Sequence, residues 1–208
     1  PARAERESPL GNLLAAGLRR WTDAEIGIVN AGQLLGGLAA GDVTEGDIHA
    51  LCPSPINPCR MKLSGTALRS ALEEALLGEF IDKEIRGFGF RGSVLGTLAV
   101  DGLEIHWNPN GAPYDKIVSI TVNGEPFDDN RRYTIGTIDM FTFGVGYETI
   151  KGGTDVHFFL PEFIRDVLAA ELVDAEALSR CNARNWHMAP SEGRNGKHTA
   201  PRADPKSY

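Results

Sequence analysis

The chain has 208 residues, of which 42% are hydrophobic and 24% charged, and 28 Asp plus Glu outweigh 21 Lys plus Arg to give a formal net charge of −7. This composition is typical of a globular protein that can bury a core without disulfides or metals, and it excludes disorder over most of the length. The acidic balance disfavours nucleic acid polymers and anionic membranes as non-specific partners, because the long-range field repels phosphate. No apolar run approaches the roughly 18 residues of a membrane span.

The N-terminal sequence gives no targeting signal from which a compartment could be predicted. The N-terminal sequence PARAERESPL lacks an initiator Met and the apolar core of a signal peptide, so we expect a piece of a longer protein and predict no compartment. Residues 1–182 are predicted to form one domain. Residues 183–208 are polar, contain Gly and Pro and have no periodicity, which predicts a tail that lies on the surface or frays.

The first half of the chain favours helices. Ser8 suits an N-cap and Pro9 the first turn of a helix. Residues 24–30 predict a short buried strand, and Thr44 with Asp47 predicts a capped helix to about residue 51. The apolar face of the first helix repeats at helical spacing and comprises Leu10, Leu13, Leu14, Leu18 and Trp21.

The prolines of residues 52–59 predict a rigid loop. A strand is predicted at 60–63, and a helix starts at Thr66. Cys52 and Cys59 in this region could be bridged or could be two reduced, partly buried thiols.

After residue 90 the pattern alternates as in strands. Residues 96–100 and 103–107 flank Asp101-Gly102, and residues 116–122 end at Asn123-Gly124. Both dipeptides tolerate positive φ and predict hairpin turns. Further strands are predicted at 132–139 and 155–160, followed by an amphipathic helix from Pro161 to Leu172. Helices in the first half and at the end, with hairpins between them, predict an α+β fold with mixed or antiparallel sheets and packed helices.

Catalytic signatures are missing from the sequence. A dinuclear metal hydrolase needs several converging His, Asp and Asn ligands, and none of the five His stands in HxH, DxH or HExxH spacing. The three Cys do not reach zinc-site spacing, and neither a nucleophile elbow nor a P-loop is present. We therefore predict no catalytic and no metal residues here, and a domain that binds substrate while another domain performs the chemistry.

Two segments could bind ligand through polar or charged groups. The turn Asn30-Ala-Gly-Gln33 follows a strand, and its amides could hydrogen-bond a base or ribose, or Asn30 could simply cap the turn. The loop from Arg86 to Gly92 places Arg91 beside two aromatic residues and could hold a phosphate or stack on a ring. Alternatively, Phe88 and Phe90 anchor this loop in the core.

A third segment, residues 137–147, changes from strand alternation to a cluster of aromatic residues and glycines. It contains Asp139, Phe141 and Phe143. Ligand sites commonly lie just past a strand end, although packing between sheet and helix explains the same pattern.

Several segments, taken in their order along the chain, resemble the C-terminal domain of the 5'-nucleotidase family. This family includes UDP-sugar hydrolases and 2',3'-cyclic phosphodiesterases. The resemblance covers about Ser8 to Leu172. It rests on SPLGNLLAAGLR, IGIVNAGQL, GDVTEGDI, CPSPIN, RMKLSGTALRSALEEAL, VNGEPFDDNRRYTIGT and DMFTFGVGYETIKGG.

The resemblance implies an N-terminal metallophosphatase domain with two divalent metal ions as the partner of this one, and a nucleoside pocket in which a base stacks between two Phe rings. Asn30 matches the family's pocket Asn. Leu35 stands where the family has an Arg in this turn, and Ser54 stands where the family has the first of the two Phe residues. The position of the second Phe falls near Asp139. Val145 replaces a pocket Asp.

The expectation is a divergent substrate-binding domain of a metal-dependent nucleotidase of nucleotide catabolism, with a nucleotide or related phosphate ester as ligand. The chain alone is predicted to be inactive and to hold no cofactor. The alternative is a stand-alone binding module that has lost nucleotide recognition. The candidate substrate-binding residues are Asn30, Gln33, Ser54, Arg91, Asp139, Phe141 and Phe143.

Overall fold

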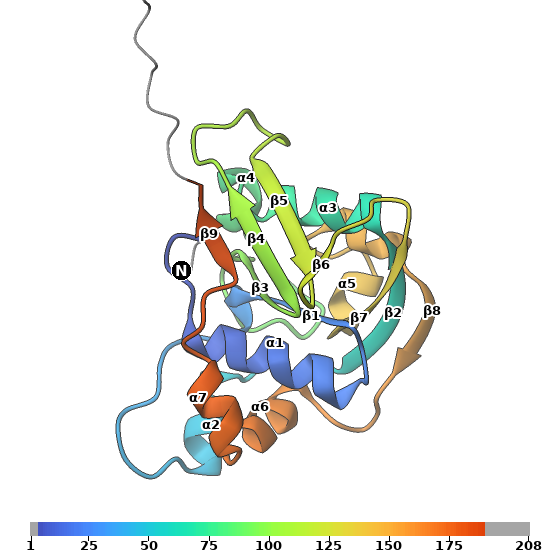
Figure 1. Ribbon diagram of the computed structural model, residues 1–208. Helices are drawn as coiled ribbons and strands as arrows, with labels where there is room; N and C mark the ends of the chain where they lie inside the picture. The colour runs from blue at the N-terminus through green and yellow to red at the C-terminus, as the bar shows by residue number, and fades with distance from the viewer. Residues whose placement is uncertain (1–3, 190–208) are drawn as a thin grey trace, which may run out of the picture.

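A computed structural model describes residues 4–189, which form two sheets with helices packed around them (Figure 1). The larger sheet has the strand order β3-β1-β7-β2-β8 and the smaller one β6-β5-β4-β9. The strands are β1 (Ile26–Asn30), β2 (Pro58–Ser64), β3 (Leu98–Asp101), β4 (Leu103–Trp107), β5 (Ile117–Val122), β6 (Glu125–Pro126), β7 (Arg132–Ile138), β8 (Thr154–Phe158) and β9 (Trp186–Met188). The helices are α1 (Pro9–Trp21), η1 (Ala31–Gln33), α2 (Glu45–Leu51), α3 (Gly65–Glu74), α4 (Gly78–Ile81), α5 (Asp139–Thr142), η2 (Glu148–Gly152), α6 (Ile164–Leu172) and α7 (Ala175–Arg180).

The pairing of the strands confirms the predicted fold class. In the larger sheet β1 runs parallel to β7, while β1–β3, β2–β7 and β2–β8 are antiparallel. In the smaller sheet β4 runs parallel to β9 and antiparallel to β5. Both are therefore mixed sheets of an α+β domain.

Helix α1 covers the larger sheet at very short range. Its predicted N-cap is confirmed, since Ser8 Oγ accepts from the Gly11 amide at 3.3 Å. A Cβ at Gly27 of β1 would lie 1.9 Å from the Ala15 carbonyl oxygen of α1. Glycine at this position lets the backbones of helix and strand approach each other directly.

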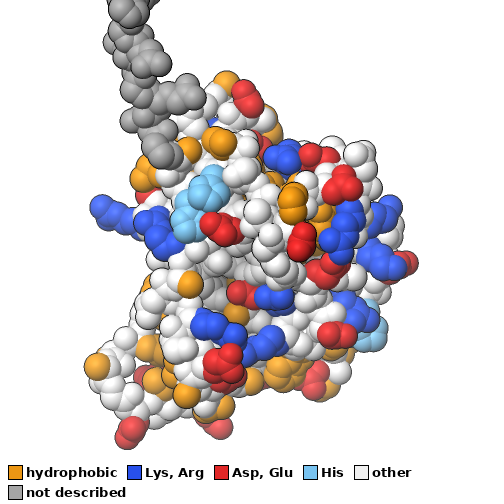
Figure 2. All heavy atoms as spheres, in the orientation of Figure 1, with side chains coloured by type: hydrophobic (Ala, Val, Ile, Leu, Met, Phe, Trp, Pro, Cys, Tyr) orange, Lys and Arg blue, Asp and Glu red, His pale blue; other side chains and the backbone are white. Residues whose placement is uncertain are grey.

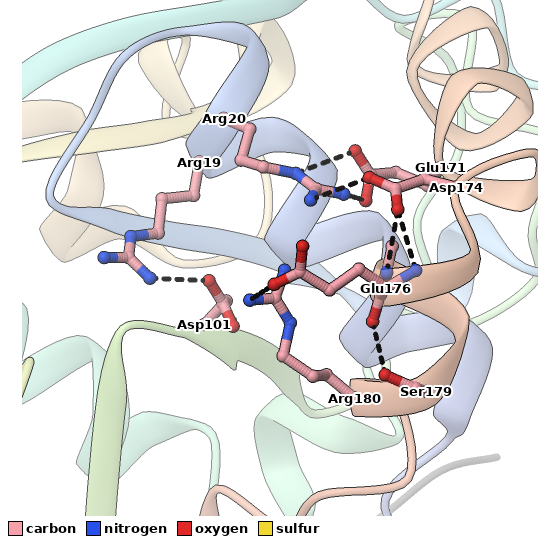
Figure 3. Close-up of polar contacts among 9 residues, drawn as sticks. Arg19, Arg20, Asp101, Glu171, Asp174, Glu176, Ser179 and Arg180 are labelled. Atoms are coloured by element: carbon pink, nitrogen blue, oxygen red, sulfur yellow. Dashed lines mark hydrogen bonds and ion pairs between the residues drawn. The ribbon is translucent and has the colours of Figure 1, made fainter.

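Ion pairs join α1 to the C-terminal helices (Figure 3). The Arg20 guanidinium binds Glu171 of α6 and lies 3.1 Å from Asp174, the N-cap of α7. On the other side, Arg19 reaches Asp101 at the end of β3, at 3.0 Å. The contacts of Arg20 join α1 to elements about 150 residues later in the sequence, and that of Arg19 joins it to a strand 82 residues later.

One predicted hairpin is wrong and one is confirmed. Gly102 has the expected positive φ of 78°, yet β3 pairs with β1 and β4 pairs with β5 and β9, so Asp101-Gly102 is a corner between sheets. Asn123 and Gly124 have φ of 50° and 86° and connect β5 to β6 as a hairpin. A dipeptide sets the local turn, whereas the partner of each strand is decided by tertiary packing.

The predicted start of the C-terminal tail, at residue 183, is too early in the sequence. Residues 186–188 form β9, and the Trp186 side chain is fully buried with its Nε1 donating to the Leu98 carbonyl oxygen at 3.1 Å. The Glu7 carboxylate accepts from the backbone amides of Asn185 and Trp186. One large aromatic residue therefore holds a polar segment on the fold. The remainder of the predicted tail, 190–208, lies outside the described residues.

The prediction of short-range elements is mostly confirmed. Thr44 and Asp47 form the expected capping box of α2. The strand predicted at 60–63 is longer and begins at Pro58, and α6 begins at Ile164 rather than Pro161. Cys52 and Cys59 are both free and buried, which confirms the interpretation as two thiols.

Strand β8 is one of the two outer strands of the larger sheet and contains a bulge. Its pairing with β2 shifts register between Arg60 and Lys62, and Asp155 has a φ of 53°. Two residues of β8 thus face one residue of β2, which bends the strand.

Candidate functional site

Three of the predicted segments meet at one edge of the larger sheet. Strands β1 and β7 are parallel and end at Asn30 and Ile138, while β2 is antiparallel to β7 and begins there, with Pro58 opposite Ile138. The turn after β1, the loop before β2 and α5 after β7 are consequently neighbours. The Asp139 amide donates to the Asn57 carbonyl oxygen at 3.0 Å across this edge.

The two amides of the first segment are enclosed. Asn30 and Gln33 are both fully buried. Asn30 Nδ2 donates to the Leu95 carbonyl oxygen at 2.8 Å, and Gln33 Nε2 donates to Asn30 Oδ1 at 3.0 Å. Gln33 Oε1 is buried without a partner in the described part of the chain. The Asn30 side chain thus connects the turn to the segment around Leu95.

Ser54 and Arg91 are joined through the backbone. Ser54 is fully buried, and its Oγ accepts from the Arg91 amide at 3.1 Å. The Arg91 side chain is exposed. Phe90 is buried as a core anchor, whereas Phe88 is 63% exposed with a φ of 53°. Only one of the two aromatic residues of this loop therefore serves the core.

The third segment presents one of its three aromatic rings to solvent. Phe141 is fully buried and meets the Tyr147 ring edge-on, with centroids 5.8 Å apart. Phe143 is 60% exposed. Asp139 is half-buried, and this desolvation raises the pKa of its carboxyl group despite hydrogen bonds from the backbone of Asn57 and Met140.

The seven candidate residues thus fall into two groups. The buried ones build the edge and are Asn30, Gln33, Ser54 and Phe141. The ones that solvent or a ligand can reach are Arg91, Asp139 and Phe143. They offer a cation, a hydrogen-bonding carboxyl group and an aromatic face.

Sequence reasoning missed a pocket on the other side of the same turn. A cavity of about 570 Å³ lies between the start of α1, the backbone of η1 and residues 93–99. A Cβ at Gly32 would lie 2.0 Å from the Val94 carbonyl oxygen, so this glycine was the signal for the close approach of 93–99. Among the described residues that line the pocket, Glu7 is the one charged side chain. Its lining includes Leu34, Leu35, Val94, Leu98, Ser8, Ser93 and Thr97.

The pocket suits the uncharged part of a ligand. Its volume lies in the range of small-molecule sites, and apolar walls with a few hydroxyl groups are typical of them. Its Glu7 carboxylate is already engaged by the backbone of residues 185 and 186 and by Arg184 at 3.5 Å. A phosphate group would find no cationic side chain among the described residues of this lining.

Within residues 4–189, no group of three or more His, Cys, Asp or Glu side chains could hold a metal ion. No helix in the same range is long and apolar enough to span a membrane.

Comparisons with known proteins agree with the fold. Residues 1–152 match the family model "5'-nucleotidase, C-terminal domain". The uncharacterized metallophosphoesterase YunD of Bacillus subtilis is 37% identical over 166 residues, covering 80% of this chain and 36% of that protein. The NAD 5'-nucleotidase of Haemophilus influenzae is 27% identical over 132 residues, covering 60% of this chain and 21% of that protein.

Among solved structures, a 5'-nucleotidase precursor from Thermus thermophilus superposes with a TM-score of 0.63 at 22% identity, covering 80% of this chain and 32% of that one. The Haemophilus influenzae NAD nucleotidase superposes with a TM-score of 0.61 at 21% identity, covering 88% and 32%. The chain thus spans about a third or less of the length of these relatives. The family model matches most of this chain, and the chain therefore belongs to the 5'-nucleotidase C-terminal domain family.

Proposed function

We propose that this chain is the substrate-recognition domain of a metal-dependent 5'-nucleotidase-like phosphoesterase and binds a nucleotide or a related phosphate ester. The observation that supports this most is that the loop of Arg91, the loop before β2 and the segment that carries Asp139 and Phe143 are joined at one end of the larger sheet by the Ser54–Arg91 and Asn57–Asp139 hydrogen bonds.

Each exposed group has a role that its chemistry allows. The Arg91 guanidinium pairs with phosphate, for which arginine's fork of donors is well suited. The exposed Phe143 ring stacks on a base or another flat group. The Asp139 carboxyl group hydrogen-bonds a hydroxyl or an amine of the ligand.

Hydrolysis itself is assigned to a different domain of the full-length protein. Two-metal phosphoester hydrolysis needs several ligands that converge on the ions, and the described part of this chain has no such set. The two divalent ions belong to that catalytic domain in this proposal. This chain's contribution is to bind and orient the ester.

The test uses the full-length protein that carries this domain. Hydrolysis of AMP, UMP and p-nitrophenyl phosphate is measured with Mn²⁺, Co²⁺ or Zn²⁺ added. Arg91→Ala and Phe143→Ala are expected to raise the KM for the nucleotides by roughly tenfold, as loss of a charged or stacking contact would. Arg86→Ala, in the same loop and 87% exposed, and Tyr114→Ala, an exposed aromatic elsewhere, are the controls.

Equal effects of test and control variants would refute the assignment of these residues. An absence of turnover with any of these esters would refute the phosphoesterase proposal as a whole. A second candidate function, a stand-alone binding module, has support from the enclosure of Asn30, Gln33 and Ser54, whose side chains no ligand reaches in this conformation. It predicts a full-length protein that lacks phosphatase activity.

A further inference from the structure

The segment that leads into α1 is held by residues close to β9. Arg184 Nη2 donates to the carbonyl oxygens of Ala4 and Glu5, at 3.3 and 3.1 Å. Arg184 Nε lies 3.5 Å from Glu7 Oε2. In Figure 2, Lys and Arg side chains project from the surface at the left, where the N-terminal end of the chain lies beside β9 in Figure 1. One guanidinium group thus contacts three residues of segment 4–7.

Glu7 adds a second set of contacts from the same segment. Its side chain is 8% exposed. Its carboxylate accepts from the backbone amide of Asn185 at 3.0 and 3.2 Å, and from that of Trp186 at 3.3 Å. Hydrogen bonds from backbone amides to a carboxylate are charge-assisted and stronger than neutral ones. Segments 4–7 and 184–186 therefore hold each other through side chains of both.

Segment 184–186 is itself fixed to the two sheets. The Asn185 carbonyl oxygen accepts from the Ile105 amide of β4 at 2.8 Å, and Asn185 Nδ2 donates to the Val100 carbonyl oxygen of β3 at 2.7 Å. The fully buried Trp186 side chain follows directly. Two domains of one chain move relative to each other unless contacts prevent it. Here the direction in which the chain enters α1 is set by contacts that lead to β3 and β4.

These contacts lie outside the part of the chain that the family comparison covers. The family model ends at residue 152, and segment 184–186 comes after it. That model describes a C-terminal domain, so in the proposed function the catalytic domain precedes α1 in the sequence. Segment 4–7 is then part of the connection between the two domains.

We propose that Arg184 is a positioning residue, which fixes segment 4–7 and through it the orientation of the preceding catalytic domain toward the sheet edge with Arg91, Asp139 and Phe143. This inference rests on the proposed function, because it needs a separate domain that performs hydrolysis. Reaction rates fall steeply when reacting groups are misplaced by about 1 Å. A loose connection therefore reduces the fraction of molecules in which the bound ester lies correctly in the catalytic site.

Removing the Arg184 side chain should loosen this connection without unfolding the domain. The side chain is 51% exposed, and the contacts of Glu7 to the backbone remain in Arg184→Ala. Exposed ion pairs contribute little to stability, so the Tm should change little. Arg180→Ala is the matched control, because the Arg180 side chain is 59% exposed and its ion pair with Glu176 stays within α7 (Figure 3).

The test measures distances between the two domains of the full-length protein by double electron–electron resonance. One nitroxide is attached through Ala112→Cys, in an exposed loop of this domain, and one to an exposed position of the catalytic domain. The partly exposed Cys181 is replaced by Ser. Arg184→Ala should give a broader distribution of distances than the wild type, and Arg180→Ala the wild-type distribution. Equal distributions in Arg184→Ala and the wild type would overturn the proposal, as would a full-length protein without a folded domain before α1.

Kinetics of the same variants separate positioning from ligand binding. Arg184→Ala should lower kcat for AMP or UMP by roughly three- to tenfold and leave KM unchanged, since the binding edge is untouched. Arg184→Lys keeps the charge beside Glu7 but lacks the fork of donors, so it should restore only part of kcat. A rise in KM at constant kcat would refute the positioning role. If the wild type hydrolyses none of these esters, the phosphoesterase proposal fails, and the distance distributions still decide the role of Arg184.

Discussion

Among single residues, Glu74 of α3 shows most directly how burial sets a pH dependence. Its side chain is buried, its carboxylate accepts from Thr149 Oγ1 at 3.1 Å, and burial together with nearby Glu148 raises its pKa, against smaller opposing effects of Thr149 and Lys83. A carboxyl pKa that is higher in the folded than in the unfolded chain means that ionised Glu74 costs stability at neutral pH. This cost disappears as the pH falls through the folded-state pKa.

Glu74→Gln should therefore raise the Tm at pH 7, with a gain that shrinks toward zero near pH 4. Thermal unfolding followed by circular dichroism at the two pH values measures this. The neighbouring Glu73 is the control, because its carboxylate accepts from the amides of Lys116 and Ile117. Glu73→Gln should lower the Tm at pH 7, since a charge-assisted pair of hydrogen bonds is weakened. A Tm at pH 7 that falls equally in both variants would contradict the argument for Glu74.

Trp186 carries the attachment of the C-terminal segment. Its side chain is fully buried, whereas that of Trp21 at the end of α1 is 37% exposed. Trp186→Ala should lower the free energy of unfolding by about 3–5 kcal/mol, the usual range for removing a buried aromatic side chain. Trp21→Ala should cost much less. Urea denaturation of both variants tests this, and equal losses would show that β9 adds nothing particular to the fold.

At the scale of elements, local signals in the sequence predict helix caps and tight turns. They do not predict which strands pair over a long distance in sequence. The caps at Ser8 and Thr44 and the turn at Asn123-Gly124 each depend on residues within a few positions, and the structure has all three. The corner at Asp101-Gly102 was mistaken for a hairpin because β3 finds its partner about 70 residues earlier, in β1. A polar composition likewise concealed β9, where one Trp provides the burial.

The contact between α1 and β1 provides a prediction for this scale. Gly27→Ala would place a methyl group against the Ala15 carbonyl oxygen, and we expect a loss of at least about 1–3 kcal/mol from overpacking. A methyl group at Gly36 would have no heavy atom within 4 Å, so Gly36→Ala is the matched control with little effect. Chemical denaturation decides between them. A Gly27→Ala protein as stable as the control would mean that helix and strand separate easily.

For the molecule as a whole, the meeting of the candidate segments could be predicted and the direction of their side chains could not. The family resemblance already brought the turn at Asn30, the loop at Ser54 and the segment at Asp139 to one place. Which ring of that segment faces solvent depends on the packing of Phe141 on Tyr147, which no local pattern encodes. The pocket beside Gly32 depends on a contact with Val94, about 60 residues away, and was missed for the same reason.

The three thiols report on the opening of the whole fold. Burial raises the pKa of Cys52 to about 12 and that of Cys59 still further, while Cys181 lies partly exposed. Reaction with Ellman's reagent at pH 8 should modify Cys181 first, because an enclosed thiol neither ionises nor meets the reagent. Cys52 and Cys59 should react at the rate of unfolding, and in denaturant all three should react at once. A Cys181→Ser variant that still shows a fast phase in native buffer would contradict this order.

The bulge at Asp155 affects how readily another extended chain can pair with the outer strand β8. Three apolar side chains in and just after β8 are partly exposed, namely Val156, Phe158 and Leu160. A straight edge strand of this composition readily pairs with another extended chain. The left-handed backbone of Asp155 interrupts the even row of amides and carbonyls that an incoming chain would need. Such a kink disfavours the addition of a further strand along β8, although apolar side chains are exposed there.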